Sequence, residues 1–221
     1  MFTWNTEGVT DLLDALKSVV QTGASKRRRA EYSSDASNYR VVPEAVVFPR
    51  NSDQVVAVHR VSREFGVPLT SRGGGTSVAG NSVGPGIVMD YSRYMNRIID
   101  IDPQSRTARV QPGVIMSDLQ DAARPHGLWF GPDPSTKNRA TFGGMIGNNA
   151  CGPHALEYGR TADNVEELEV IDGLGRRYRA GDDLSVVPGL EQLVQSNLAP
   201  IRTELGRFTR QVSGYSLEHL L

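Results

Sequence analysis

Residues 72–81 read RGGGTSVAGN, a run of three glycines followed by two hydroxyl residues. Three adjacent glycines, Gly73 to Gly75, weaken any helix or strand, so they suit a sharp bend or a place where the backbone comes very close to something else. Backbone N–H groups that are freed from a sheet can converge on an anion, and Thr76 and Ser77 add hydroxyl donors. The stretch therefore predicts a loop that binds a phosphate or a pyrophosphate.

The pattern upstream of this loop predicts two strands joined by a helix. Residues 45–50 (AVVFPR) form a β-branched run, and residues 51–66 place apolar residues on one helical face, with Ser52 as N-cap and Gly66 as the stop. Residues 67–73 (VPLTSRG) return as a strand that delivers the glycines at its carboxyl end, where α/β sheets bind ligands. These proportions indicate a βαβ unit.

Other segments show strand or helix patterns. Short strands over residues 86–90, 97–102 and 107–113 suggest a meander. The remaining expected elements are helices over residues 9–20, 114–127 and 190–205 and a hairpin over residues 165–180. The run KRRR at residues 26–29 is interpreted as a solvated basic patch in preference to a phosphate contact.

A second glycine cluster, TFGGMIGNNACGPHALEYG, occupies residues 141–159. No lysine follows the first cluster as a P-loop requires, and Val78 stands where the third glycine of a Rossmann fingerprint belongs. Taken alone, the first loop is also compatible with a simple turn. Two glycine surfaces with interleaved asparagines favour a long ligand such as a dinucleotide, with its pyrophosphate at one loop and an aromatic ring system along the other.

Composition excludes several classes of function. The 221 residues are 38% hydrophobic and 22% charged with a net charge of -1, which argues against disorder and against a nucleic-acid-binding face. No run approaches the length of a membrane span, and the first residues lack the features of a secretory signal. Cys151 is the only cysteine, so this chain alone cannot hold an Fe–S cluster, and no histidine spacing suggests a metal site. A cytoplasmic location is expected, with any membrane association through a partner.

Six segments in order resemble the FAD-binding domain of the vanillyl-alcohol oxidase/PCMH flavoprotein superfamily: VVFPRNSDQVVAV, GVPLTSRGGGTSVAGN, IDIDPQSRTARVQPGV, HGLWFGPDPST, TFGGMIGNNACGPHALEYGRTADNV and LEVIDGLG. The similarity is greatest to the branch of glycolate oxidase subunits and D-lactate or D-2-hydroxyglutarate dehydrogenases, especially large members fused to an Fe–S half. It covers residues 32–179, and EYSSDASNYRVVP and VSGYSLEHLL extend it toward both ends.

The resemblance implies an α+β fold of two lobes, a small α/β lobe and a larger mixed-sheet lobe, with FAD between them. On this basis the domains are an N-terminal helical segment (1–40), the FAD-binding domain (41–182, with lobes at about 41–100 and 101–182) and a C-terminal helical segment (183–221) that leads to a cap domain beyond this chain. Cofactor-binding roles then fall on Arg72, Gly73, Gly74, Gly75, Thr76, Ser77, Gly80, Asn81, Pro132, Asp133, Thr141, Gly143, Gly144, Gly147, Asn148, Asn149, Gly152 and Gly159.

Some relatives attach flavin covalently through the histidine of an R-x-G-G-H loop. The matching position here is Thr76, so noncovalent FAD is expected. Cys151 could be a redox thiol or a flavin tether, but a packing role is favoured for a lone cysteine among small residues. His154 and Tyr158 follow the second glycine cluster and are the candidate catalytic residues, with a structural role at least equally well supported.

The resemblance implies the FAD-binding part of an oxidoreductase that dehydrogenates a small-molecule 2-hydroxy acid of the D-lactate, glycolate or D-2-hydroxyglutarate type. In the family, the substrate-binding cap and any Fe–S segment follow this domain, so this chain alone is expected to be inactive. The alternatives are a non-catalytic flavin-binding or scaffold fragment, and a flavin oxidase of an alcohol, phenol or sugar acid, because this half reads the cofactor and not the substrate. The electron acceptor, the stereochemistry and the oligomeric state stay open.

Overall fold

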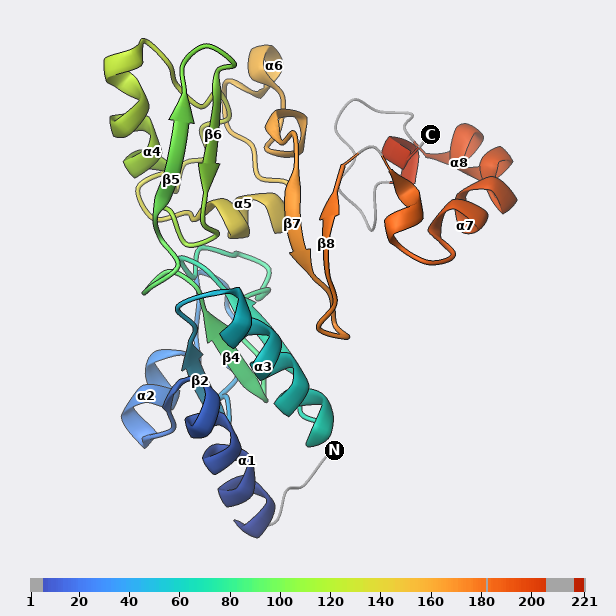
Figure 1. Ribbon diagram of the computed structural model, residues 1–221. Helices are drawn as coiled ribbons and strands as arrows, with labels where there is room; N and C mark the ends of the chain where they lie inside the picture. The colour runs from blue at the N-terminus through green and yellow to red at the C-terminus, as the bar shows by residue number, and fades with distance from the viewer. Residues whose placement is uncertain (1–5, 182, 206–216, 221) are drawn as a thin grey trace. The chain divides into compact units, whose positions relative to one another are not determined.

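A computed structural model describes residues 6–181, 183–205 and 217–220 of the chain (Figure 1). The chain divides into two compact units. The first unit comprises residues 1–164 and 173–175, and the second comprises residues 165–172 and 176–221. The glycine clusters both lie in the first unit, so the site can be built from that unit alone.

A four-stranded sheet begins the first unit. Its strands are β1 (Gln21–Gly23), β2 (Ala45–Phe48), β3 (Leu69–Arg72) and β4 (Ile87–Asp90), in the order β1-β2-β4-β3. β4 pairs in parallel with both β2 and β3, and β1 joins the edge antiparallel to β2. Every residue of β2 and β4 is buried, and both strands are apolar apart from Asp90 at the end of β4, as is typical of strands covered on both faces. The polar strand β1 was not predicted.

Two amphipathic helices pack against each other beside this sheet (Figure 1). α1 (Thr6–Val19) buries Leu12 and Leu16, and α3 (Ser52–Glu64) buries three valines of its apolar face. Both helices were predicted, but α3 is capped one residue earlier than expected. The side chain of Asn51, and not that of Ser52, accepts the hydrogen bond from the N–H of Gln54, at 3.0 Å.

The expected meander is wrong. β4 does not pair with β5 (Ile98–Asp102), because it inserts between β2 and β3 instead. Among the described strands, β5 pairs only with β6 (Thr107–Val110), as an antiparallel hairpin with an irregularity between Ile98 and Asp100. In the βαβ segment, α3 therefore connects β2 to β3, and β4 lies between these two strands in the sheet.

The second glycine cluster belongs to a packed group of helices around this hairpin. They are α4 (Met116–Ala123), η1 (Arg124–His126), α5 (Phe142–Gly147), α6 (Ala155–Tyr158) and η2 (Ala162–Asn164). Their core contains Val114, Met116, Leu119, Ala140, Phe142 and Met145. The rings of Phe130 and Phe142 meet edge to face, with centroids 5.0 Å apart. This core fixes the position of the chain on both sides of Thr141.

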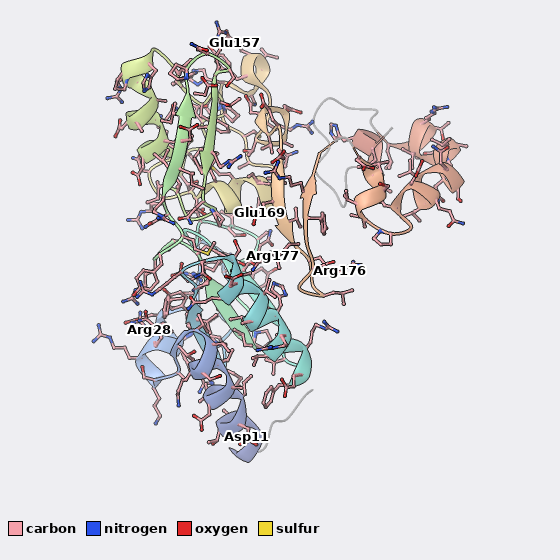
Figure 2. All side chains as sticks on the ribbon, viewed as in Figure 1. Asp11, Arg28, Glu157, Glu169, Arg176 and Arg177 are labelled. Atoms are coloured by element: carbon pink, nitrogen blue, oxygen red, sulfur yellow. The ribbon has the colours of Figure 1, made fainter. Side chains whose placement is uncertain are left out.

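The basic run lies on α2 (Lys26–Glu31) and is not simply a solvated patch. Arg28, labelled in Figure 2, donates to Glu31 at 2.8 Å, and its guanidinium lies 5.4 Å from the ring centroid of Phe48. Arg29 donates to the carbonyl of Pro43, and its side chain is 31% exposed. These two arginines attach α2 to its surroundings, while Arg27 is 90% exposed as expected.

The second unit contains a hairpin followed by short helices. β7 (Leu168–Ile171) pairs antiparallel with β8 (Arg177–Ala180), as predicted. η3 (Leu184–Val186), α7 (Leu190–Ser196) and α8 (Leu198–Glu204) follow, and α7 and α8 bury Val194 and Ile201. In the C-terminal segment, η4 (Leu217–Leu220) is described, whereas residues 206–216 and 221 lie outside the described residues.

Among the described residues, no helix combines the length and apolar character that crossing a membrane requires. The secondary structure mixes helices with parallel and antiparallel strands, so the predicted α+β class is confirmed.

Candidate functional site

The first glycine loop leaves β3 at Arg72, at the carboxyl end of a parallel strand as predicted. Gly75 and Gly80 adopt left-handed conformations with φ of +65° and +78°. Between them, the hydroxyl of Ser77 accepts hydrogen bonds from the N–H groups of Ala79 (3.2 Å) and Asn81 (3.1 Å). The loop is thus a defined turn with its hydroxyls and amides at one sheet edge.

The second glycine loop begins at Thr141, which is the N-cap of α5. The first amides of this helix are already used: the N–H of Phe142 donates to Val114 O at 2.9 Å and that of Gly143 to Pro112 O at 2.8 Å. A Cβ on Gly143 would come within 2.8 Å of Pro112 Cβ. Gly143 therefore serves the packing of α5, whereas the following turn of the helix faces a cavity.

The two glycine loops contact each other directly. A Cβ on Gly73 would overlap Oγ1 of Thr141, and a Cβ on Gly74 would overlap the carbonyl oxygen of Arg139. At these two positions, the glycine backbone comes close to other atoms of the same chain, and the predicted close approach is therefore not to a ligand. The loop that follows Gly74 then borders an open space.

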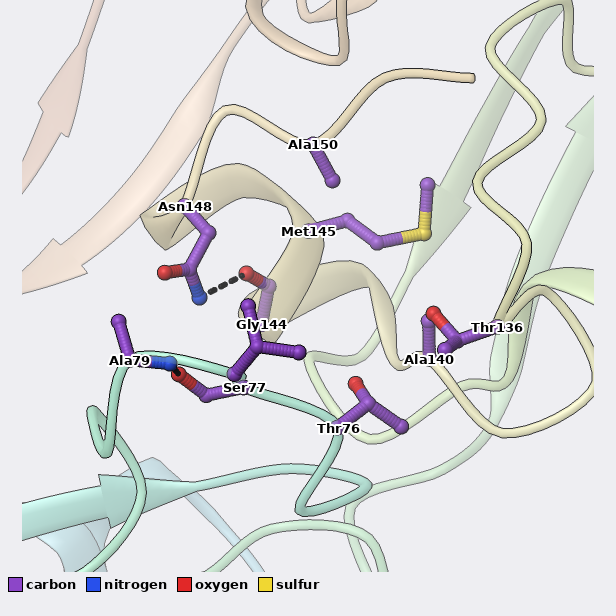
Figure 3. Close-up of a pocket in the computed structure, with 10 residues that line it drawn as sticks. Thr76, Ser77, Ala79, Thr136, Ala140, Gly144, Met145, Asn148 and Ala150 are labelled. Atoms are coloured by element: carbon purple, nitrogen blue, oxygen red, sulfur yellow. Dashed lines mark hydrogen bonds between the residues drawn. The ribbon is translucent and has the colours of Figure 1, made fainter. Parts of the chain in front are cut away.

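Two adjacent cavities of about 190 and 70 Å³ lie between the loops. Four residues line both of them: Thr76, Ser77, Gly144 and Asn148 (Figure 3). The larger cavity is otherwise lined mainly by apolar groups, and the smaller one by glycines and polar groups. The further residues of the larger cavity are Val78, Ala79, Thr136, Ala140, Met145 and Ala150; those of the smaller one are Ser71, Gly73, Gly74, Gly75, Asn81, Ser82 and Thr141.

One residue that lines the smaller cavity, Thr141, carries a buried hydroxyl. Thr141 is 1% exposed, and its Oγ1 has no hydrogen-bond partner among the described residues. Leaving such a group unpaired costs about 1–3 kcal/mol. A ligand atom in the cavity would remove this cost, as would be expected at a site for a polar ligand.

Gly144 supplies a second sign of a ligand site. A Cβ at Gly144 would lie 3.4 Å from Thr141 Oγ1, an ordinary contact distance, and Gly144 lines both cavities. The chain's own packing therefore does not require a glycine there. A ligand that approaches the backbone of α5 would require one.

Asp133 lies on the neighbouring loop, where it binds His154 and does not line either cavity. It is 9% exposed and accepts hydrogen bonds from His154 Nδ1 (2.8 Å) and from the His154 N–H (3.3 Å). Burial by itself raises the pKa of Asp133, but the hydrogen bonds and charge of His154, with the charge of Lys137, outweigh it and lower the pKa below the usual value. A Cβ on Gly152 would overlap the Asp133 carbonyl, so this glycine also serves packing.

The candidate catalytic residues His154 and Tyr158 form an aromatic cluster with Trp129. The ring centroids of Trp129 lie 5.7 Å from His154 and 6.0 Å from Tyr158. Neither residue lines the two cavities. The charge of Glu157, with a hydrogen bond to it, raises the pKa of Tyr158 above its usual value.

The predicted site residues described next line neither cavity. Arg72 donates to the carbonyls of Ser34 (3.0 Å) and Ser82 (3.1 Å), so its guanidinium holds backbone. Asn149 has a φ of +45°, and its Oδ1 accepts from the N–H of Ala162 at 3.0 Å. Gly147 has open space around its Cβ position, Gly159 adopts a φ of +74°, and Pro132 is buried.

Sequence reasoning missed the apolar and small residues that line the larger cavity. Val78 carried a signal in the sequence, because it is an apolar residue within a glycine-rich polar loop. In the structure its side chain is 81% exposed. Met145, Ala140 and Ala150 carried none, because they read as ordinary core residues of a helix and its flanks. Cys151, next to Ala150, is half-buried and has a free thiol. No cluster of three metal-ligating side chains is found in the part of the chain that the structure describes.

Comparisons with known proteins agree with this geometry. The chain is 38% identical over 217 residues to a D-2-hydroxyglutarate dehydrogenase of Pantoea ananatis, a match that covers 96% of this chain and 20% of the relative. It is 39% identical to the glycolate oxidase subunit GlcD of Bacillus subtilis, with 73% of this chain and 35% of the relative covered. The chain thus spans only about a fifth to a third of the length of these relatives.

Solved structures show the same fold. p-Cresol methylhydroxylase with substrate bound matches with a TM-score of 0.66 at 19% identity, over 84% of this chain and 37% of that protein. The predicted PCMH-type fold is confirmed. The model of the FAD binding domain family matches residues 43–181, more than half of the chain. With one glycine loop at the carboxyl end of a parallel strand and a second glycine loop in contact with it, the chain belongs to the FAD binding domain family.

Proposed function

We propose that this chain is the FAD-holding part of an oxidoreductase that dehydrogenates a 2-hydroxy acid. The observation that carries the proposal is the cavity between the glycine loops, where a buried Thr141 hydroxyl lacks a partner among the described residues and Gly144 leaves space for a ligand. The names of the relatives, D-2-hydroxyglutarate dehydrogenase and glycolate oxidase subunit, support a 2-hydroxy acid as substrate. The single cysteine supports a reducing, cytoplasmic location.

The residues around the cavities fit the cofactor. The polar cavity, with its glycine backbone and the hydroxyls of Thr76, Ser77 and Thr141, suits a pyrophosphate. Neither cavity approaches the roughly 300–1,000 Å³ of a closed ligand pocket, so each would hold only part of a dinucleotide. When bound, FAD supplies the hydride acceptor for the reaction, and the chain supplies binding and orientation.

Noncovalent binding follows from Thr76. This residue lines both cavities at the place where some relatives of the superfamily carry the flavin-linking histidine. A threonine hydroxyl is a hydrogen-bond donor and acceptor but not a nucleophile at its ordinary pKa. Cys151 stays outside both cavity linings.

Gly144→Ala is the sharpest test of the site. The added methyl group meets the chain's own atoms at ordinary contact distance, and alanine stabilises a helix interior by about 1 kcal/mol over glycine. We therefore expect the variant to unfold at the same temperature as wild type or above it, yet to bind FAD at least about tenfold more weakly because the methyl group occupies the cavity. Gly74→Val is less informative, since its Cβ overlaps Arg139 O and would disturb the loop contact itself.

The matched control is Gly173→Ala, which adds the same methyl group at a glycine with open space, outside both cavities. FAD affinity is measured by quenching of flavin fluorescence on the full-length protein after removal of bound flavin. Wild-type affinity in Gly144→Ala would show that the cofactor does not approach α5 here. The substrate class is tested separately by anaerobic bleaching of the flavin with D-2-hydroxyglutarate, D-lactate and glycolate; a flavin that none of them reduces would exclude these substrates.

A further inference from the structure

Residues 33–41, which precede the four-stranded sheet's second strand, form a short loop of their own. The N–H of Val41 donates to the carbonyl of Ser33 at 2.8 Å, and Ser34 and Arg40 form an isolated antiparallel bridge. No site residue was assigned to this segment from the sequence. Several of its contacts nevertheless lead to the first glycine loop.

The segment meets the glycine loop at three points. The N–H of Ala36 donates to the carbonyl of Gly75 at 3.1 Å. The ring of Tyr39 covers Gly80, where a Cβ would come within 2.7 Å of Cδ2. Asp35 makes the third contact, at the far end of the loop. Because Gly75 and Gly80 have positive φ values, the segment supports the loop where its backbone is most unusual.

Asp35 holds the end of the loop through Ser82. Its Oδ2 accepts a hydrogen bond from Ser82 Oγ at 2.8 Å and a longer one from the Ser82 N–H at 3.4 Å. Its Oδ1 accepts from the N–H of Ser37 at 2.9 Å, which fixes the carboxylate itself. Ser82 lines the smaller cavity and is 7% exposed, so its hydroxyl is committed to Asp35 in a partly buried, charge-assisted bond.

Arg72 closes the same network from the other side. Its Nη1 donates to Ser34 O and Ser82 O, and its guanidinium lies 5.1 Å from the ring centroid of Tyr32. One cation and one carboxylate therefore fix the last residue of β3, the N-terminal segment and the end of the glycine loop relative to one another.

We infer that Asp35 is a positioning residue of the dinucleotide site, which acts through Ser82 to hold the glycine-loop backbone in its binding conformation. The inference rests on the proposed function. A carboxylate cannot itself attract a phosphate, so the role of Asp35 is indirect. Its loss should affect ligands that carry phosphate and spare the affinity for a flavin that lacks it.

The test compares Asp35→Ala, Ser82→Ala and the double variant in the full-length protein freed of flavin. FAD, ADP and riboflavin are titrated against each. We expect the Kd for FAD and ADP to rise about tenfold in both single variants, because each loses the same charge-assisted hydrogen bond, and the Kd for riboflavin to stay unchanged. The double variant should be no weaker than the weaker single one, since the two residues act as one unit.

Asp102→Ala is the matched control. Asp102 accepts hydrogen bonds from the N–H of Gln104 and the hydroxyl of Ser105, both at 2.8 Å, in a turn that lines neither cavity. Its loss removes the same chemistry elsewhere and should leave all three affinities unchanged.

Two results would overturn the inference alone: unchanged FAD affinity in Ser82→Ala and Asp35→Ala, or an equal loss for all three ligands, which would reveal general destabilisation. If Asp35→Ala does not fold, Ser82→Ala decides by the same criteria, because it removes the same bond and leaves the carboxylate in place. A wild-type protein that binds no FAD would refute the proposed function, and the inference with it.

Discussion

The side-chain amide of Asn81 donates a 2.6 Å hydrogen bond to Oδ1 of Asn148, and this bond joins the first glycine loop to the end of α5. The amide nitrogen of Asn148 donates in turn to Gly144 O at 3.0 Å. Asn148 lines both cavities, and Figure 3 shows its side chain among the residues of the larger one. Its side-chain amide is neutral, so it adds no negative charge that would repel an anion in the cavities.

Asn148→Asp should weaken FAD binding by charge. The new carboxylate can still accept the hydrogen bond from Asn81, but it adds a negative charge to both cavities. We expect the Kd for FAD to rise at least about tenfold at low salt, with a smaller effect at high salt, because exposed charges are screened. Titrations at two ionic strengths check this. Asn148→Ala removes both hydrogen bonds without adding charge, so an equal, salt-independent loss in both variants would contradict the expectation.

Thr141→Val should stabilise the flavin-free protein and weaken FAD binding. Valine has nearly the shape of threonine and removes a buried hydroxyl that has no partner among the described residues. The free energy of unfolding of the flavin-free protein, measured in urea, should therefore rise by about 1 kcal/mol. The same change removes a donor from the polar cavity, and the Kd for FAD should increase.

Thr161→Val is the control for that pair of opposite effects. Thr161 is fully buried like Thr141, but its hydroxyl donates to Ala150 O at 2.6 Å. We expect this variant to lose about 1 kcal/mol of stability because the hydroxyl's hydrogen bond is lost, while the N–H of Thr161 still donates to Ala150 O at 2.9 Å. Destabilisation of the flavin-free protein by Thr141→Val would mean that the Thr141 hydroxyl is satisfied in solution and is not reserved for a ligand.

Flavin should leave the protein on acid precipitation. Thr76 occupies the position of the linking histidine, and the described cavity linings contain no histidine or cysteine that could form a covalent link to flavin. The flavin absorbance of the supernatant and of the redissolved pellet measures how much flavin is released and how much stays with the protein. Flavin that remains with the pellet after washing would show a covalent link.

The sequence predicted elements whose stability is local and failed where pairing is not local. β2, α3 and β3 were found because a buried strand and an amphipathic helix carry their own hydrophobic pattern. The position of β4 between β2 and β3 was missed, because adjacent strands in sequence usually pair and nothing in residues 87–90 names their partners. β1 was missed because its three residues, QTG, have no apolar pattern and form a strand only by pairing with β2 at the edge of the sheet.

The glycine clusters show the same division at the site. The sequence correctly predicted close backbone approach at Gly73 and Gly74, but it could not identify Thr141 and Arg139 as the groups approached. The partnerless hydroxyl of Thr141 among the described residues and the open space at Gly144 depend on packing across the two loops. Asp35 was missed for a related reason, because its partner Ser82 lies 47 residues further along the chain.

Asp133→Asn should destabilise the protein in a pH-dependent way. The pKa of Asp133 is lower in the folded protein than its ordinary value of 3.8, so the ionised form stabilises the fold. This contribution is fully present above the pKa of the unfolded chain and is lost as the pH falls through the folded pKa. We therefore expect the variant to be about 1 kcal/mol less stable than wild type at pH 7, because its contacts with His154 weaken, and the difference to shrink below about pH 4.

Urea unfolding of wild type and variant between pH 7 and pH 3 measures this difference. Asp14→Asn removes one charge of the same sign from an exposed pair, in which the Lys17 and Asp14 side chains are 59% and 67% exposed, and should cost at most about 0.5 kcal/mol at pH 7. A deficit of Asp133→Asn that is constant down to pH 3 would show that the hydrogen bonds to His154 do not depend on the charge of Asp133. In that case Asp133 would hold residues 152–154 by shape, through its carbonyl beside Gly152, and not as an anion.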